Sequence, residues 1–177
     1  GLIETSSLAQ LILSGSGDAS AANGQAGTWL LDPYNVGIRH TLSGFGVDDS
    51  GQLPNFTPTA SGSEVTDTAI EAQLNAGTNV VISTVNNGGG EAGNVTQASD
   101  ASIDVVFAAA GNSATFTINA ANHIVLDGGI TVANGKLNVA LNANTVPDDP
   151  DLGSGNVEIN APINTNGGAF SSSGVNF

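Results

Sequence analysis

Short runs in which apolar and polar residues alternate are the main pattern of this chain. Such alternation predicts strands with one buried face, and the Gly, Asn, Asp and Ser residues between the runs predict turns. An apolar run at 11–13 adds a further short strand. The alternating runs lie at 103–107, 115–118, 123–126, 137–141 and 156–159.

Several of these runs repeat. Both the stretch from Asn122 and the stretch from Gly155 end in an Asn-Gly turn, at 134–135 and 166–168. The matching apolar pairs are Ile124 with Val157, Leu126 with Ile159, and Ile130 with Ile163. We also match 116–118 with 137–139, at an offset of 21 residues, and 77–84 with 121–128. A degenerate period near 21 with short strands predicts an all-β solenoid, in which alternate residues point into the core.

Residues 63–78 interrupt the strand pattern and predict one short helix. Thr66 or Asp67 can cap its start, Ile70 and Leu74 fall on one face, and Gly77 can end it. The stretch 45–66 has two Pro and little apolar periodicity, which predicts a loop insertion. The expected organisation is therefore strands over 1–44, an insertion with a short helix over 45–78, and continuing strands over 79–177.

Composition narrows the function classes. The 177 residues include 16 acidic and two basic ones, Arg39 and Lys136, which give a net charge of -14. So few cations exclude nucleic-acid binding by phosphate neutralisation and disfavour anionic membranes. The absence of Cys excludes disulfides and thiolate chemistry, and no apolar run approaches the roughly 20 residues of a membrane span. The opening GLIETSSLAQ lacks the basic and apolar regions of a signal peptide, so we expect a segment of a longer protein.

A set of motifs in a fixed order carries a resemblance to a known family. The motifs are GTWLLDPYNV at 27–36, IEAQLNAGTNVVIST at 70–84, GGITVANGKLNVALNAN at 128–144 and INTNGGAF at 163–170, preceded by GLIETSS at the start. The chain resembles the haemagglutinin-repeat region of filamentous-haemagglutinin-like adhesins, which are exported by two-partner secretion. The resemblance covers nearly the whole chain and implies a right-handed parallel β-helix, a secreted or cell-surface location and a role in adhesion or filament building. It implies an outer-membrane transporter as partner of the full-length protein, and no membrane insertion.

Trp29 and Tyr34 are the only Trp and Tyr of the chain and both fall in the first large motif. Flat aromatic faces bind sugar rings, so the two form a candidate binding platform. The alternative places Trp29 in the core and Tyr34 at a join where Pro33 forces an extended backbone. Recurrence of the motif in the resembling family favours the core alternative.

Two acidic loops are candidate calcium sites. Asp148, Asp149 and Asp151 supply three carboxylates within four residues, and Asp48 with Asp49 forms a second pair that could also bind a ligand. Neither has the spacing of an EF-hand, so a solvated loop is the alternative. No other cofactor is expected.

The remaining candidate positions are two sequons and two histidines. Asn55 and Asn94 begin Asn-X-Thr sequons and are candidate glycosylation sites, with a polar turn as the alternative. His40 and His123 lack a third ligand nearby in the sequence, so His123 is interpreted as a turn residue.

The sequence favours an adhesin segment over an enzyme. A lyase needs convergent bases and a hydrolase needs convergent carboxylates, whereas the two basic residues are distant in sequence and the acids are scattered through turns. An ice-binding face needs a regular Thr register, which is missing. We expect partners among surface glycans or proteins of host or neighbouring cells. A structural fibre subunit that associates end to end is the second expectation, and a carbohydrate-active enzyme is a third.

Overall fold

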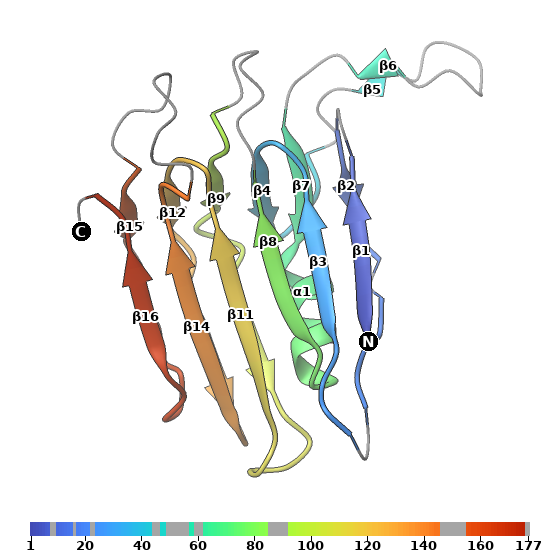
Figure 1. Ribbon diagram of the computed structural model, residues 1–177, viewed down its shortest axis with the longest axis vertical. Helices are drawn as coiled ribbons and strands as arrows, with labels where there is room; N and C mark the ends of the chain where they lie inside the picture. Colours follow the sequence, from blue (N-terminus) through green and yellow to red (C-terminus); the bar gives the residue numbers. More distant parts are fainter. Residues whose placement is uncertain are drawn as a thin grey trace.

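Two six-stranded parallel β-sheets lie face to face in this computed structural model (Figure 1). It describes residues 1–7, 10–15, 17–21, 24–43, 47–48, 57–58, 62–84, 92–145 and 155–175. The front sheet contains, in spatial order, β1 (Leu2–Ser6), β3 (Thr28–Asp32), β8 (Asn79–Ser83), β11 (Ser113–Asn119), β14 (Lys136–Asn142) and β16 (Phe170–Ser173). The rear sheet contains, in spatial order, β2 (Ile12–Leu13), β7 (Ser63–Thr66), β4 (Val36–Arg39), β9 (Val95–Gln97), β12 (Ile124–Leu126) and β15 (Val157–Ile159).

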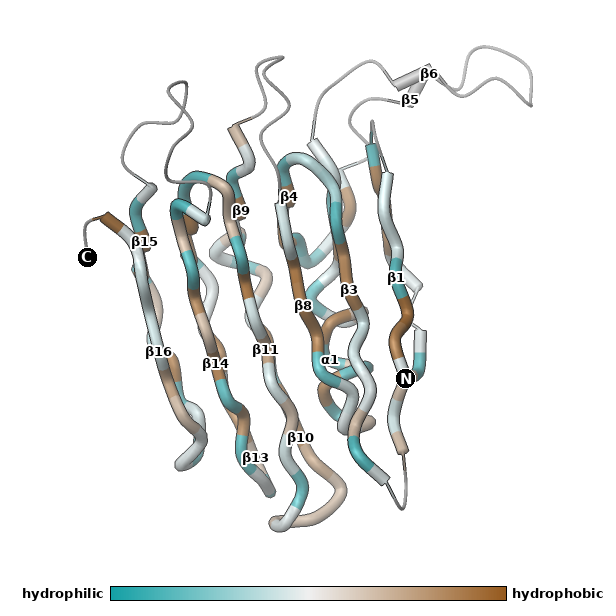
Figure 2. Tube along the Cα trace, viewed as in Figure 1, coloured by the Kyte–Doolittle hydropathy of each residue, from teal (hydrophilic) through white to brown (hydrophobic). Residues whose placement is uncertain are grey.

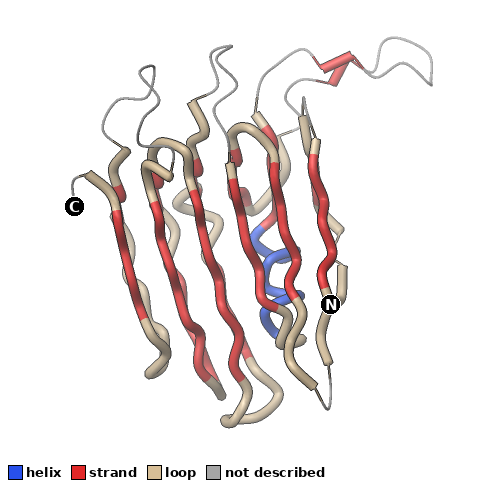
Figure 3. Tube along the Cα trace, viewed as in Figure 1, coloured by secondary structure: helices blue, strands red, loops and turns tan. Residues whose placement is uncertain are grey.

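Smaller elements lie beside the two sheets. Strands β10 (Ile103–Val106) and β13 (Ile130–Ala133) pair in parallel (Figure 2). Ile163 extends this side pair through a bridge to Ile130. Strands β5 (Val47–Asp48) and β6 (Thr57–Pro58) form a separate antiparallel pair. The helix α1 (Asp67–Asn75) is the only helix in the described part of the chain (Figure 3). The protein is therefore mostly β with parallel sheets and one short helix, as the sequence predicted.

The order in which the chain visits the sheets differs between its two halves. From β11 onward it passes from the front sheet to the rear sheet, then to the side pair, and returns to the front sheet next to the strand it left. In the first half, β4 and β7 are neighbours in the rear sheet, and β7 lies between β2 and β4. There α1 follows β7 and packs against β10. The helix thus occupies the position next to β10 that a further side strand would fill.

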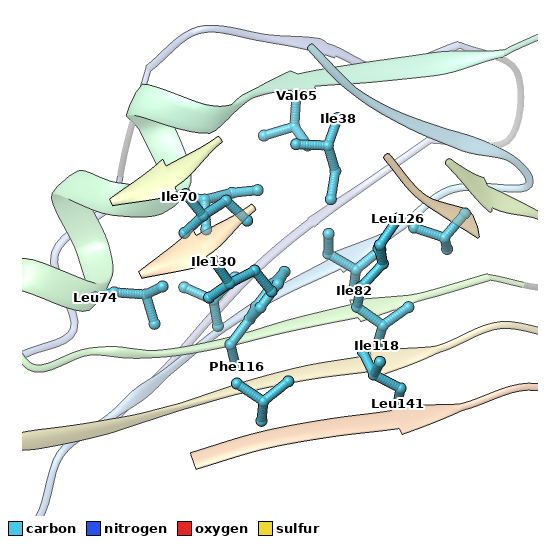
Figure 4. Close-up of a cluster of buried hydrophobic side chains, with 14 of the residues drawn as sticks. Ile38, Val65, Ile70, Leu74, Ile82, Phe116, Ile118, Leu126, Ile130 and Leu141 are labelled. Atoms are coloured by element: carbon cyan, nitrogen blue, oxygen red, sulfur yellow. The ribbon is translucent and has the colours of Figure 1, made fainter. Parts of the chain in front are cut away.

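Inward residues of successive strands stack in register across each sheet. One row of the front sheet contains Ile3, Trp29, Val80, Phe116, Val139 and Phe170. Its four central members are buried, whereas Phe170 at the end is 48% exposed. Figure 4 shows Ile82, Ile118 and Leu141 of the neighbouring row facing Leu126 of the rear sheet. The alternation read from the sequence places these apolar side chains in one continuous core, whose burial stabilises the fold.

The predicted matches of the second half are correct in the rear sheet and the side pair. Ile124 pairs with Val157, Leu126 with Ile159, and Ile130 with Ile163. The two Asn-Gly turns are also present, since Asn134 and Asn166 have positive φ angles of 56° and 50°. Asn adopts this left-handed conformation more readily than most residues, which explains its place in the turns.

The two other predicted matches are wrong. Phe116 pairs with Val139 and not with Leu137, so the strands are 23 residues apart instead of 21. A shift of two residues keeps the same side chains pointing inward, so alternation cannot distinguish these registers. Val80 pairs with Phe116 in the front sheet, whereas Ile124 belongs to the rear sheet, so 77–84 and 121–128 are not equivalent. Pairs between β11 and β14 are separated by 23 residues and pairs between β8 and β11 by 36 residues, so the period near 21 is also wrong.

The predicted helix is confirmed. Thr66 is the N-cap and its side chain accepts a hydrogen bond from the Ala69 amide, while Gly77 ends the segment at φ 83°. Ile70 and Leu74 are fully buried against the core (Figure 4). The structure differs from the expectation over 63–66, because these residues form β7 within the rear sheet and are not part of an insertion. Of the expected insertion before them, only 47–48, 57–58 and 62 lie among the described residues.

Candidate functional site

Trp29 lies in the core of the front sheet. Its side chain is 1% exposed and its indole nitrogen donates to the Thr5 hydroxyl at 3.2 Å. Its ring therefore presents no face to a ligand, and this burial favours the core interpretation of Trp29. Tyr34 is partly exposed at the corner between β3 and β4, directly after the buried Pro33.

The acidic candidates fall largely outside the described residues. This holds for Asp148, Asp149, Asp151 and Asp49, and Asp48 is described only as part of the backbone of β5. The proposed calcium site therefore stays a prediction. Within the described ranges, no three His, Asp or Glu side chains converge as metal ligands.

A ladder of side chains connects the starts of successive rear-sheet strands. The Asn35 side-chain oxygen Oδ1 accepts from the Asn94 backbone amide at 2.7 Å, and the Asn94 Oδ1 accepts from the His123 backbone amide at 3.1 Å. His123 Nδ1 then accepts from the Asn156 amide at 3.0 Å, which places its ring proton on Nε2. His123 is thus a turn residue, as predicted. These bonds satisfy backbone amides where each strand begins.

The two sequons have different outcomes. Asn55 lies outside the described residues. Asn94 is half-buried and its side-chain oxygen belongs to the ladder. Glycosylation at either position stays a prediction, with a ladder role for Asn94 added by the structure.

A charged cluster lies on the outer face of β4 and β7. Arg39 Nε lies 3.7 Å from Glu64 Oε1, and the Ser43 amide and hydroxyl both donate to the Glu64 carboxylate. The Arg39 guanidinium covers Gly37, where a β-carbon would come within 3.0 Å of Nε. A side chain at position 37 would therefore displace the guanidinium from its place against the strand.

This cluster lines a polar groove of about 350 Å³ on the outer face of the rear sheet. Asn35, Asn94 and Thr96 complete the lining that Arg39 and Glu64 begin. A second groove of about 290 Å³ shares Asn94 and Thr96 and continues over β12 and β15. The two grooves together cross the rear sheet at right angles to its strands.

A second charged pair lies at the start of α1. His40 Nδ1 lies 2.9 Å from Asp67 Oδ2, and the Asp67 side chain is almost fully buried while His40 is exposed. The hydrogen bond with Asp67 and the charge of that carboxylate raise the pKa of His40 above its ordinary value of 6.5. The Asp67 carboxylate also favours the helix N-terminus, where backbone amides are unpaired.

Side chains of α1 terminate the side pair of strands. Glu71 Oε1 accepts from the Asp104 amide at 2.7 Å, and Asn75 Oδ1 accepts from the Val106 amide at 2.7 Å. Glu71 and Asn75 are four residues apart on one helical face, so they match alternate amides of β10. Burial raises the pKa of Glu71, and the charges of Asp67 and Asp104 add to the rise.

Sequence reasoning missed the groove and the ladder. The only signal for the groove was Gly37 between two apolar residues, together with Arg39, the single Arg of the chain. The signal for the ladder was an Asn or His directly before a short strand, at Asn35, Asn94 and His123. Neither signal distinguishes such residues from ordinary turn residues.

Comparison with known proteins adds no assignment, since no protein-family model and no curated protein sequence matches the chain. Among the described residues, no helix combines the length and apolar character needed to cross a bilayer.

Proposed function

We propose that the chain is a segment of a large secreted or cell-surface bacterial adhesin, in which a right-handed parallel β-helix forms a rigid rod. The observation that carries the proposal is the path of the chain from β11 to β16, which visits front sheet, rear sheet and side position and then repeats. Each such turn adds one layer of about 4.8 Å, so a long chain of similar turns makes a long, narrow body.

The ordered motifs at 27–36, 70–84, 128–144 and 163–170 support the same proposal through the family they resemble. The net charge of -14 and the absence of Cys fit an extracellular protein that is exported unfolded through an outer-membrane transporter. We place the protein outside the cell on these grounds. Its rod would hold a binding region away from the bacterial surface.

In this proposal the rod is the scaffold, and the variable connections 45–61 and 145–155 contribute specificity. The first connection is shortened from the expected 45–66 because 63–66 belong to β7. Their partners are surface glycans or proteins of host or neighbouring cells. Deleting either connection should reduce binding of the purified chain to target cells while the far-ultraviolet circular dichroism stays unchanged. Full binding after both deletions would contradict this assignment of the connections.

A structural subunit of an extracellular fibre is the second candidate function. The observation that favours it is the position of exposed apolar side chains at the two ends of the sheets. Leu2 and Ile12 lie at one end, and Ile159, Phe170 and Val175 lie at the other. Edge strands with exposed apolar residues can pair with a second copy, and head-to-tail pairing of this kind builds open filaments.

Electron microscopy of the purified chain over a range of concentrations tests both candidates. Single short rods at every concentration would support the scaffold role. Rods that lengthen with concentration would support the fibre subunit. Compact particles without an elongated axis would contradict the β-helical rod itself.

A further inference from the structure

The outer face of the rear sheet has a hollow at Gly37. Gly37 lies in register between Glu64 of β7 and Thr96 of β9, so a position without a side chain is flanked by two polar ones. The groove of about 350 Å³ lies beside the Arg39 guanidinium that covers Gly37. Together with its continuation over β12 and β15, it crosses five strands, a span of about 19 Å at about 4.8 Å per strand.

The groove presents hydrogen-bonding groups whose positions are fixed by the fold. The Asn35 and Asn94 oxygens accept from backbone amides, which orients both side chains and leaves their Nδ2 groups to donate. The Arg39 guanidinium is held over Gly37, and the Glu64 carboxylate is held by two bonds from Ser43. Donors and acceptors are therefore preorganised side by side, which lowers the entropy cost of binding a polar ligand.

The charge of the groove indicates the class of ligand. Arg39 and Glu64 neutralise each other, and the chain as a whole carries a net charge of -14. A polyanion would be repelled by this field. An uncharged ligand with many hydroxyl groups can instead donate hydrogen bonds to Glu64. It can also accept hydrogen bonds from Arg39 and from the side-chain amides of Asn35 and Asn94.

We infer that the groove over Gly37 binds a neutral, linear oligosaccharide laid across the strands of the rear sheet. The site goes beyond the proposed function, because it adds a recognition surface on the sheet that is separate from the connections 45–61 and 145–155. None of the described residues that line the two grooves is aromatic, so the contacts that these residues offer are hydrogen bonds without ring stacking. Affinity for a short sugar is correspondingly modest, at a dissociation constant of about 1 mM.

Nuclear magnetic resonance titration of the full chain tests this inference. The probes are maltotetraose, cellotetraose and chitotetraose, with a heparin-derived tetrasaccharide as the anionic comparison. We expect at least one neutral sugar to shift the backbone amides of Gly37 and Thr96 and the side-chain amide of Asn94. Arg39→Ala should weaken this binding about tenfold or more, because it removes a charged donor.

Lys136→Ala is the matched control, since it removes the same charge from an exposed position on β14 in the front sheet. It should leave the affinity unchanged. Equal weakening by both substitutions, shifts confined to other surfaces, or no response to any neutral sugar would each overturn the inference. Tighter binding of the heparin fragment would overturn the neutral class of ligand.

The outcomes also separate this inference from the adhesin proposal. Rods in the microscope without any sugar response would overturn the groove as a binding site and leave the adhesin proposal standing. Sugar binding by compact particles would support the groove and contradict the rod.

Discussion

The two halves of the molecule build the same pair of sheets by different routes. In residues 113–173, each strand pairs with one 23 to 33 residues away, and all three positions of a turn are strands or a bridge. In the first half, the partners in the β2–β7 and β4–β9 pairs are 52 and 59 residues apart, β7 returns between β2 and β4, and a helix takes the side position. Stacking of inward rows is therefore compatible with very different connections, provided that the edge amides of β10 find acceptors on α1.

The largest expected effect tests whether one core row joins the two halves. Phe116→Ala removes a fully buried ring between Val80 and Val139, and we expect the free energy of unfolding to fall by about 3–5 kcal/mol. Phe170→Ala in the same row is the control. Its ring is 48% exposed, so the loss should be only about 1–2 kcal/mol. Urea denaturation followed by circular dichroism measures both, and equal losses would argue against a continuous row.

The helix that distinguishes the first half depends on its cap. Thr66→Ala removes the acceptor of the Ala69 amide and should lower the free energy of unfolding by about 1 kcal/mol. Thr68→Ala removes an exposed hydroxyl that donates to Thr66 Oγ1 at 3.1 Å but leaves the cap acceptor in place, so it should change the free energy of unfolding by less than about 0.5 kcal/mol. The same denaturation assay applies. A loss at Thr68 as large as that at Thr66 would show that the cap is not the stabilising contact.

The contact between α1 and β10 has a charge-dependent part. Glu71→Ala leaves the Asp104 amide without its acceptor and should cost about 0.5–1.5 kcal/mol. Glu71→Gln keeps an oxygen acceptor and removes a charge that burial and nearby acids disfavour. The raised pKa of Glu71 means that the folded protein favours the neutral carboxyl, whereas at neutral pH the carboxyl is charged. Glu71→Gln should therefore keep or slightly raise the free energy of unfolding at neutral pH. Hydrogen exchange of the Asp104 amide reports the contact directly, and identical behaviour of the two variants would rule out the acceptor role.

The smallest expected effect is the pH dependence of the pair at the helix start. Asp67 raises the pKa of His40, so protonated His40 stabilises the folded protein. This contribution is fully present below pH 6.5 and is lost as the pH rises through the higher pKa that His40 has in the folded protein. Asp100 and Glu71 also face His40 and act in the same direction. Denaturation midpoints should decline with pH over this window and should decline less in His40→Gln. A decline of the same size in the variant would assign the effect to another group.

The sequence predicted local features well because short-range patterns determine them. The cap at Thr66, the buried pair Ile70 and Leu74, and the turns at Asn134 and Asn166 all follow from backbone preferences of a few neighbouring residues. The match of Ile124 with Val157 followed from two similar segments at similar positions in consecutive turns.

Long-range order was not predictable in the same way. Leu137 and Val139 both point inward, so alternation cannot select which of them pairs with Phe116. The strands at 79–83 and 124–126 have the same local pattern although they belong to different sheets. The candidate groove could not be predicted from Gly37 and Arg39 alone, because it also needs Glu64, which the pairing of β7 with β4 places beside them. The candidate calcium and glycosylation positions stay predictions.

The position of β7 between β2 and β4 also restricts the order in which strands can pair during folding. The rear sheet cannot form strand by strand from the N-terminus. Residues 12–13 pair only with β7, so they have no partner strand in this sheet until residues 63–66 are also in place. Closing so long a loop is slow compared with closing the shorter ones of the second half. During refolding, the Glu64 amide, which donates to Leu11, should therefore gain exchange protection after the Ile124 amide, which donates to Asn156.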